Sequence, residues 1–310
     1  MGKTVRWGKP FKDERDWPDY NEELVVRGVF LLEFDWVKNW DKELDQMNEG
    51  KVGARYEFPE TLIELQAVWG QWLDVRGLEG CARQLAKQGL IPDFDDYTTI
   101  WRRVSKVKTK IKIENGQAYD VSSDGSGLKM NCAGEYREDK YGDRKRKKFI
   151  KVTITADPRR KKLLAVDACI EGEGDSEPVA AQAQITGIIE DGNSILRAWG
   201  DGSFDTRPFF NFLEKNDIES AVKIRKNAST KSKGSMRRAR EVRNYKRKGY
   251  AEWAKENEYG LRWPGTEGFF SAVKRKFGEK IRSKKPENMC LEGERRFWAY
   301  DRISEYAKNR

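Results

Sequence analysis

Three acidic residues, far apart in the sequence, have the types and neighbours that phosphoryl-transfer chemistry needs. Asp124 lies in the stretch DGSG and Asp201 in the stretch GDGS, each at the end of a segment with a strand-like pattern. Glu267 opens an amphipathic segment with helical spacing, and Lys274 follows two helical turns later. Carboxylates that share divalent cations can hold the attacking and leaving oxygens of a phosphodiester. These residues are therefore candidates for a metal-dependent site that acts on nucleic acid.

Each of these acids also has an ordinary structural explanation. Asp-Gly pairs are common turn signals, so Asp124 and Asp201 could simply end strands. An acid in the first turn of a helix complements the helix dipole by about 0.3–1 kcal/mol, which would account for Glu267. If the predicted strand register is off, other acids compete for the same role, namely Asp120, Asp167, Glu171 and Asp205.

The predicted order of secondary structure would bring the two aspartates together. From about residue 117 the pattern is strand, strand, strand, helix, strand, helix, strand, over residues 118–130, 148–158, 162–172, 177–189, 194–202, 206–217 and 220–226. The first three strands have short connections and favour an antiparallel meander, and the whole order is that of an RNase H-like domain. In such a sheet the first and fourth strands are neighbours, so the ends that carry Asp124 and Asp201 would lie side by side. Glu267 would come from a helix packed against the same edge.

Composition limits the kinds of protein that this chain can be. Its 310 residues suffice for one large domain or two ordinary ones. The 61 Lys and Arg against 51 Asp and Glu give a formal net charge of +10, which favours a polyanionic partner such as nucleic acid. With no histidine, an ordinary zinc site and a histidine-based triad are excluded. The widely spaced cysteines, and the lack of a signal core or membrane-length apolar run, lead us to expect a cytoplasmic protein with no membrane partner.

The chain divides into two predicted parts. We expect residues 1–112 to form an all-helical DNA-binding region, and residues 113–310 to form an α/β RNase H-like catalytic domain with a mixed sheet. Within the first part, residues 78–107 read as a short helix, a turn with proline and a basic helix that carries Arg102 and Arg103. That pattern is typical of a helix-turn-helix, whose second helix can enter a major groove. Two packed core helices that merely expose arginines would give nearly the same pattern.

A strongly basic segment lies at residues 223–258, and we expect it to be partly helical. Between residues 223 and 248 there are twelve Lys or Arg and one acid, Glu241. An exposed charge run is usually only a solvated face, but this imbalance favours contact with phosphates. The side chains that we expect to bind DNA here are Arg237, Arg238, Arg240, Arg243 and Lys246.

The sequence resembles the DDE transposases of bacterial and archaeal insertion sequences, from RDWPDYNEELVVRG to ENMCLEGERRFWAYD. In such families the first Asp sits in a D-[ST]-T-G-like turn, here DGSG at Asp124. The second sits in a D-G-x-[FY]-D motif, here DGSFD at Asp201. The third acid, a Glu, is followed seven residues later by Lys, here Glu267 and Lys274. Together these motifs are specific, whereas each alone would be weak.

The resemblance implies roles for these residues. Asp124, Asp201 and Glu267 would bind two Mg²⁺ or Mn²⁺ ions, and Lys274 would contact a phosphate at the transposon end. A Tyr-x-x-Arg element that precedes the Glu and contacts DNA corresponds to two further residues, Tyr259 and Arg262. Four residues, rather than the usual three, separate this arginine from the Glu. Three tryptophans could stack on an unpaired base, although tryptophans more often belong to the core: Trp199, Trp253 and Trp263.

The resemblance implies a transposase that cleaves the ends of its element and joins the freed 3′-hydroxyl to target DNA. Its partners would be double-stranded DNA, as terminal inverted repeats and as target, and a second copy of the chain in a synaptic homodimer. Two alternatives stay open. One is a catalytically inactive DNA-binding protein derived from such an enzyme, which is favoured by unusual residues in the last helix, Gly293, Arg295 and Asp301. The other is an RNase H-like nuclease without strand transfer.

Overall fold

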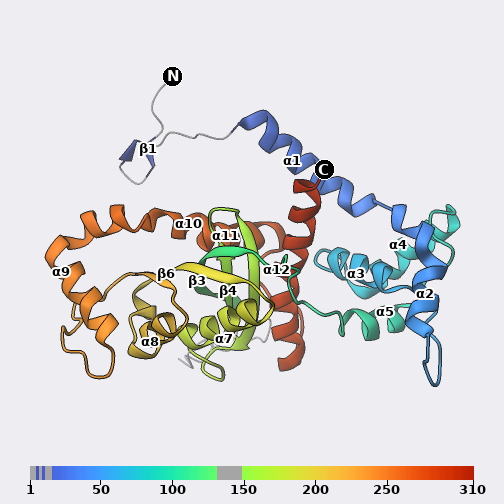
Figure 1. Ribbon diagram of the computed structural model, residues 1–310. Helices are drawn as coiled ribbons and strands as arrows, with labels where there is room; N and C mark the ends of the chain where they lie inside the picture. The colour runs from blue at the N-terminus through green and yellow to red at the C-terminus, as the bar shows by residue number, and fades with distance from the viewer. Residues whose placement is uncertain (1–4, 7–8, 11–15, 131–148) are drawn as a thin grey trace, which may run out of the picture.

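The computed structural model describes residues 5–6, 9–10, 16–130 and 149–310, and its centre is a five-stranded mixed sheet (Figure 1). The strand order is β5-β4-β3-β6-β7. The strands are β3 (Ala118–Lys129), β4 (Phe149–Asp157), β5 (Lys162–Ile170), β6 (Ser194–Gly200) and β7 (Glu219–Val222). β4 runs antiparallel to both of its neighbours, β3 and β5, whereas β6 and β7 run parallel to β3. This is the RNase H-like topology that the order of elements predicts.

Helices cover both faces of the sheet. On one face lie α7 (Glu177–Glu190) and α8 (Arg207–Lys215), which bury an apolar cluster against β3 and β6. On the other face lie α11 (Glu267–Phe277) and α12 (Pro286–Lys308), packed against alternate residues of β4. Both faces are thus buried, and β4 is buried over most of its length, including the polar side chains of Thr153 and Thr155 that alternate with its apolar ones. No helix in the described ranges has the length and apolar composition of a membrane span.

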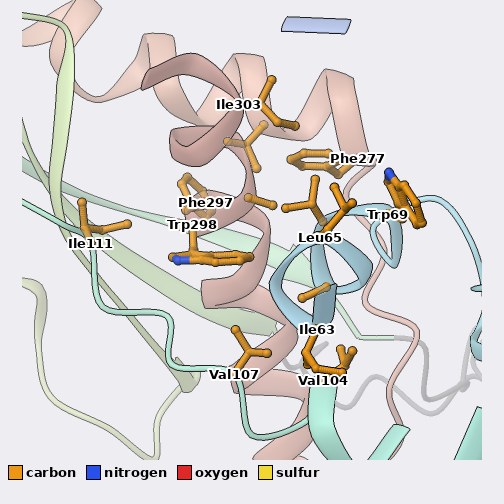
Figure 2. Packing of buried hydrophobic residues seen from close by; sticks show 14 of the residues in the cluster. Ile63, Leu65, Trp69, Val104, Val107, Ile111, Phe277, Phe297, Trp298 and Ile303 are labelled. Atoms are coloured by element: carbon orange, nitrogen blue, oxygen red, sulfur yellow. The ribbon is translucent and has the colours of Figure 1, made fainter. Parts of the chain in front are cut away.

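The N-terminal residues form helices that pack on the far side of α12. This part of the chain begins with two short paired strands, β1 (Val5–Arg6) and β2 (Lys9–Pro10). Its helices are α1 (Trp17–Val29), α2 (Trp40–Asn48), α3 (Glu60–Trp69), α4 (Val75–Lys87) and α5 (Tyr97–Val104). The 3₁₀ turns η1 (Phe30–Leu32) and η2 (Asp35–Asn39) lie between α1 and α2. Figure 2 shows Phe297 and Trp298 of α12 in one apolar cluster with Ile63 and Leu65 of α3. The helices of this part and the sheet therefore share a continuous core. The division into two domains near residue 112 stays a prediction.

The helix pair predicted within residues 78–107 is present as α4 and α5, which pack against each other. Between them the chain turns at Gly89, whose φ of +71° is a conformation that suits glycine. The carboxylate of Asp96 then caps α5 by accepting hydrogen bonds from the backbone N–H groups of Thr98 and Thr99. Whether this pair reads DNA stays a prediction.

The basic segment after β7 begins without helix and continues as α9 (Met236–Glu256). That helix is kinked at Gly249, which has a φ of +77° and a ψ of 168°. The 3₁₀ turn η4 (Tyr259–Leu261) and the short helix α10 (Arg262–Gly265) then lead back to the sheet. The strand predicted over residues 220–226 is shorter than expected. It stops at Val222 because the strand that it pairs with, β6, ends at Gly200.

The range predicted for the first strand, 118–130, is confirmed, but the placement of Asp124 at the end of this strand is wrong. β3 continues to Lys129, and Asp124 lies opposite Ile154 in the middle of the β3–β4 ladder. The stretch DGSG is therefore extended backbone and not a turn, because β4 is long enough to pair with all of it. Asp201 directly follows the last residue of β6, as predicted.

Burial of Asp301 on α12 gives a testable prediction about stability. The residue is 5% exposed, and burial raises the pKa of its carboxyl to about 7, with Glu305, Lys162, Lys308 and Arg302 nearby. The unfolded pKa is about 3.9, so the folded state holds an extra proton between these values and loses stability as the pH rises through this range. Asp301→Asn is expected to raise the free energy of unfolding by about 2–4 kcal/mol at alkaline pH and by little at about pH 4. Urea denaturation at both pH values measures this difference, and an equal effect at both would contradict the assigned cause.

Candidate functional site

The sheet places Asp124 and Asp201 next to each other. The parallel register of β3 and β6 ends with Ser122 opposite Trp199, so two further residues along each strand bring Asp124 opposite Asp201. Asp201 is held by its own turn, since its Oδ1 accepts hydrogen bonds from Ser203 N at 2.7 Å and Ser203 Oγ at 2.5 Å. This turn is the 3₁₀ segment η3 (Gly202–Phe204). Two carboxylates on neighbouring strands thus point to one edge of the sheet.

Glu267 reaches this edge through a close approach of the chain to β3. The segment α10 ends at Gly265, where an added Cβ would lie 2.7 Å from Pro158 Cβ and 3.3 Å from Ser122 Cβ. No larger residue would let the backbone pass so near the sheet. Glu267 then starts α11, and that helix is fixed by Phe270 and Val273, both buried. The apolar stripe of α11 therefore determines where its first carboxylate lies.

Arg262 connects the first and third acids. Its Nη1 lies 2.7 Å from Asp124 Oδ2, and its Nη2 lies 3.9 Å from Glu267 Oε1. Burial raises the pKa of Asp124 to about 6, and the Arg262 charge opposes this shift. Although its separation from Glu267 is one residue longer than usual, Arg262 is thus within the site.

Tyr259 and Lys274 lie at the periphery of the same site. Tyr259 is buried, and its hydroxyl donates a hydrogen bond to the carbonyl of Gly200 at 3.2 Å, which fixes the end of β6 before Asp201. Burial raises the pKa of Tyr259, so the phenol stays neutral. Lys274 Nζ lies 2.9 Å from Ser126 Oγ on β3, on the side of α11 that also carries Glu267. The lysine therefore stands beyond Asp124 along the strand.

The side chains of Asp124, Asp201 and Glu267 are of a chemical type that can bind a hard divalent cation. It offers carboxylate oxygens, which are the ligands that Mg²⁺ and Mn²⁺ prefer. Across residues 16–130 and 149–310, however, no three His, Cys, Asp or Glu side chains are gathered closely enough to form a metal cluster. In this arrangement the guanidinium of Arg262 provides the positive charge beside Asp124.

A fourth carboxylate lies at this site that the sequence did not predict, that of Glu177 at the start of α7. Its Oε2 lies 3.1 Å from Ser203 Oγ, the same hydroxyl that contacts Asp201. Its side chain also fills the space left by Gly125, where an added Cβ would come within 2.5 Å of Glu177 Oε1. The absence of a side chain at Gly125 therefore makes room for the Glu177 side chain. A hydroxyl has one proton, so Ser203 can donate to only one of the two carboxylates at a time.

The four acids that the sequence offered as alternatives to Asp124, Asp201 and Glu267 either have other partners or lie elsewhere in the fold. Asp120 pairs with Arg159 at 2.5 Å, and Asp167 accepts a hydrogen bond from Gln184 at 2.7 Å. Glu171 follows the end of β5, two strands away from β3. Asp205 is buried beneath the turn that carries Asp201. The structure thus brings together Asp124, Asp201 and Glu267 rather than these alternatives.

The basic residues predicted to contact DNA fall into two groups. Several are engaged within the chain: Arg238 with Asp205, Arg103 with Glu60 and Phe58 O, and Arg237 with Ile218 O. Others are exposed, namely Arg240, Arg243 and Lys246 on α9 and Arg102 on α5. Two of these also have partners within the chain, since Arg240 pairs with Glu214 and Lys246 donates to the carbonyl of Ala228. Of the three tryptophans, Trp199 and Trp253 are core residues, each 1% exposed. Trp263, next to Arg262, is 57% exposed.

The chain is similar in sequence to a known family of proteins. Residues 116–301, more than half of the chain, match the family model described as "Transposase DDE domain". Among solved structures, the chain is similar to the piggyBac transposase in a cryo-EM synaptic complex with hairpin DNA. The overlap covers 93% of this chain and 75% of that one, with 12% identity and a TM-score of 0.38. The family assignment rests on the sequence match.

Proposed function

Because the chain belongs to the family of transposase DDE domains, we propose that it is a DNA transposase of the insertion-sequence kind, which cleaves the ends of its element and joins them to target DNA. The observation that carries the proposal is the convergence of Asp124, Asp201 and Glu267 from three separate elements on one edge of the sheet. A site of this kind performs phosphoryl transfer by positioning and charge neutralisation, without a covalent intermediate.

The cofactors would be two Mg²⁺ or Mn²⁺ ions held by these three carboxylates. When bound, such ions lower the pKa of an attacking water and stabilise the charge that develops on the phosphodiester oxygens. Ser203 N would keep the Asp201 carboxylate oriented, while Glu177 would compete with Asp201 for the proton of the Ser203 hydroxyl. Arg262 would be free to bind a DNA phosphate once the charge of Asp124 is neutralised by a cation.

Double-stranded DNA would lie across the site and extend to both ends of the molecule. Figure 1 shows α9 at one end of the sheet and α3–α5 at the other. The exposed arginines of α9 would follow the DNA backbone, and α5 would read the terminal repeat. Lys274 would contact a phosphate near the cleaved bond, and exposed Trp263 offers a ring for an unpaired base. A homodimer would bring two ends together.

The test is a cleavage and joining assay on a labelled duplex that carries the element's own ends, with Mg²⁺ or with EDTA. Joined product that requires both the metal and the correct end sequence would support the proposal. Cleavage without joining would instead indicate a nuclease, and binding without cleavage would indicate an inactive DNA-binding protein. A protein that neither binds nor cleaves this duplex would refute the proposal.

A further inference from the structure

A cavity separates α12 from the N-terminal helices, away from the acidic site. Its volume is about 310 Å³, and it is lined by the ends of α3 and α5, the start of α4, the chain after α11, and one side of α12. The α12 residues that line it are Asn288, Glu292 and Arg295, which recur at spacings of four and three along one face. The cavity thus lies where the predicted DNA-reading helices meet the catalytic part.

The two arginines that line this cavity differ in their partners. Arg282 donates hydrogen bonds to the carbonyls of Gly70 and Leu73, and its Nε lies 3.9 Å from Glu292. Arg295 has no hydrogen bond or ion pair with any residue in the described ranges, and its Nε is buried without a partner. Arg282 therefore connects two parts of the fold, whereas the donors of Arg295 are unused.

The acids near Arg295 are already occupied. Glu292 accepts hydrogen bonds from the backbone N–H groups of Arg282 and Ser283 and from Arg296 at 2.8 Å. Glu294 accepts from Thr109 Oγ1 at 2.9 Å and from Ala168 N at 3.2 Å. Burial lowers the pKa of Arg295, but an arginine stays charged at neutral pH. The chain thus maintains a partly buried cation whose burial cost the charges of Glu292 and Glu294 offset only in part, and no hydrogen bond from a described residue satisfies its buried Nε.

We propose that Arg295 binds a phosphate of the DNA backbone in this cavity, next to the helix that reads the DNA. A guanidinium with free donors matches the geometry of a phosphate group. The cavity is also lined by Trp101 of α5, which is 52% exposed, and the neighbouring Arg102 is exposed as well. A duplex on α5 would therefore pass over the mouth of the cavity. This inference rests on the proposed function, since it requires that the chain binds DNA.

The site would connect DNA reading to the catalytic sheet. Two residues before Arg295, Gly293 lies against the sheet, where an added Cβ would be 3.3–3.4 Å from Ile150, Ala168 and Val152. The same turn of α12 thus contacts both the cavity and the strand that pairs with β3. Two of the unusual residues of the last helix are then explained: Gly293 by its close packing on the sheet and Arg295 by ligand binding.

The experiment compares Arg295→Met and Arg295→Lys with the wild type, using a fluorescent duplex that carries the element's own terminal repeat. Arg295→Met is expected to weaken binding about 5- to 10-fold and to reduce the slope of log K against log salt by about 0.9, the value of one phosphate contact. The Lys variant should retain most of that slope. The melting temperature of Arg295→Met should equal or exceed that of the wild type, because an unpaired cation has been removed.

Arg282→Met is the matched control, since it removes a guanidinium from the same cavity. It should lower the melting temperature and leave the salt slope unchanged. The inference is overturned if the wild type binds the duplex and Arg295→Met binds it with the same affinity and slope. It is also overturned if inorganic phosphate stabilises the wild type, but not Arg295→Met, while DNA binding is equal, because the ligand is then a free anion. Failure of the wild type to bind any duplex would refute the proposed function as well.

Discussion

Asp201→Asn is expected to lower the rate of DNA end cleavage by about 10³-fold or more while the protein stays folded. If Asp201 holds a metal ion, as proposed, its loss removes several kcal/mol of transition-state stabilisation, and each 1.36 kcal/mol changes the rate tenfold. The fold should survive because an asparagine side-chain oxygen can still accept the hydrogen bond from Ser203 N that Asp201 accepts now. Glu267→Gln is expected to have an effect of the same size.

The measurement combines cleavage kinetics with metal binding. Calorimetric titration of Mn²⁺ into the protein should show a lower affinity for the ion in Asp201→Asn than in the wild type. This measurement does not depend on any activity. Asp120→Asn is the matched control, because it makes the same chemical change on strand β3 but affects a partly exposed pair with Arg159. We expect this control to cleave within about twofold of the wild type, since pairs of this kind contribute little. Equal loss in both variants would contradict the assignment of the site.

The order of helices and strands was predictable from the sequence because the alternating pattern of the strands and the three-to-four-residue spacing of the helices are both strong. Strands with alternating or β-branched patterns and helices with apolar stripes give the topology, and topology alone makes the first and fourth strands neighbours. Asp201 beside β3, and Glu267 at the start of α11, follow from that reasoning. These features depend on local pattern and on general rules of sheet connection.

The features that sequence analysis missed depend on contacts between distant segments. DGSG looks like a turn, but its backbone stays extended because β4 pairs with it as far as Lys129. Glu177 looks like an ordinary first residue of a helix, and only the packing of α7 brings it to Gly125 and Ser203. The same holds for Asp205, a candidate acid in the sequence whose buried partner lies on α9. No local pattern encodes such pairings.

Asp205→Ala is expected to lower the free energy of unfolding by about 3–5 kcal/mol, the largest stability effect that we predict for a single residue. The Asp205 side chain is fully buried, and its two oxygens lie 2.6 and 3.0 Å from Nε and Nη2 of Arg238. Asp205 Oδ2 also accepts a hydrogen bond from Arg225 N at 3.0 Å. Removal of the carboxylate would leave the buried Arg238 charge without compensation.

Urea denaturation of a double-mutant cycle measures this coupling. Asp205→Ala and Arg238→Met together should destabilise the protein by clearly less than the sum of the single changes, because the second change removes the uncompensated charge. Glu214→Ala is the matched control, since Glu214 on α8 and Arg240 on α9 form an exposed pair at 3.1 Å. It should cost no more than about 1 kcal/mol. A similar small cost for Asp205→Ala would show that the buried pair does not hold α9 in place.

The same change should also impair cleavage under conditions where the variant is still folded. Asp205 ends the η3 turn that begins at Asp201, and its partner Arg238 lies in the first turn of α9. The pair therefore fixes the η3 turn and the basic helix α9 relative to each other. If both act on one DNA duplex, loosening the pair should reduce the cleavage rate and leave weak, non-specific DNA binding, which depends on the exposed arginines of α9, nearly unchanged. Cleavage and binding that fall in equal proportion would instead mean that the pair serves only to keep α9 folded.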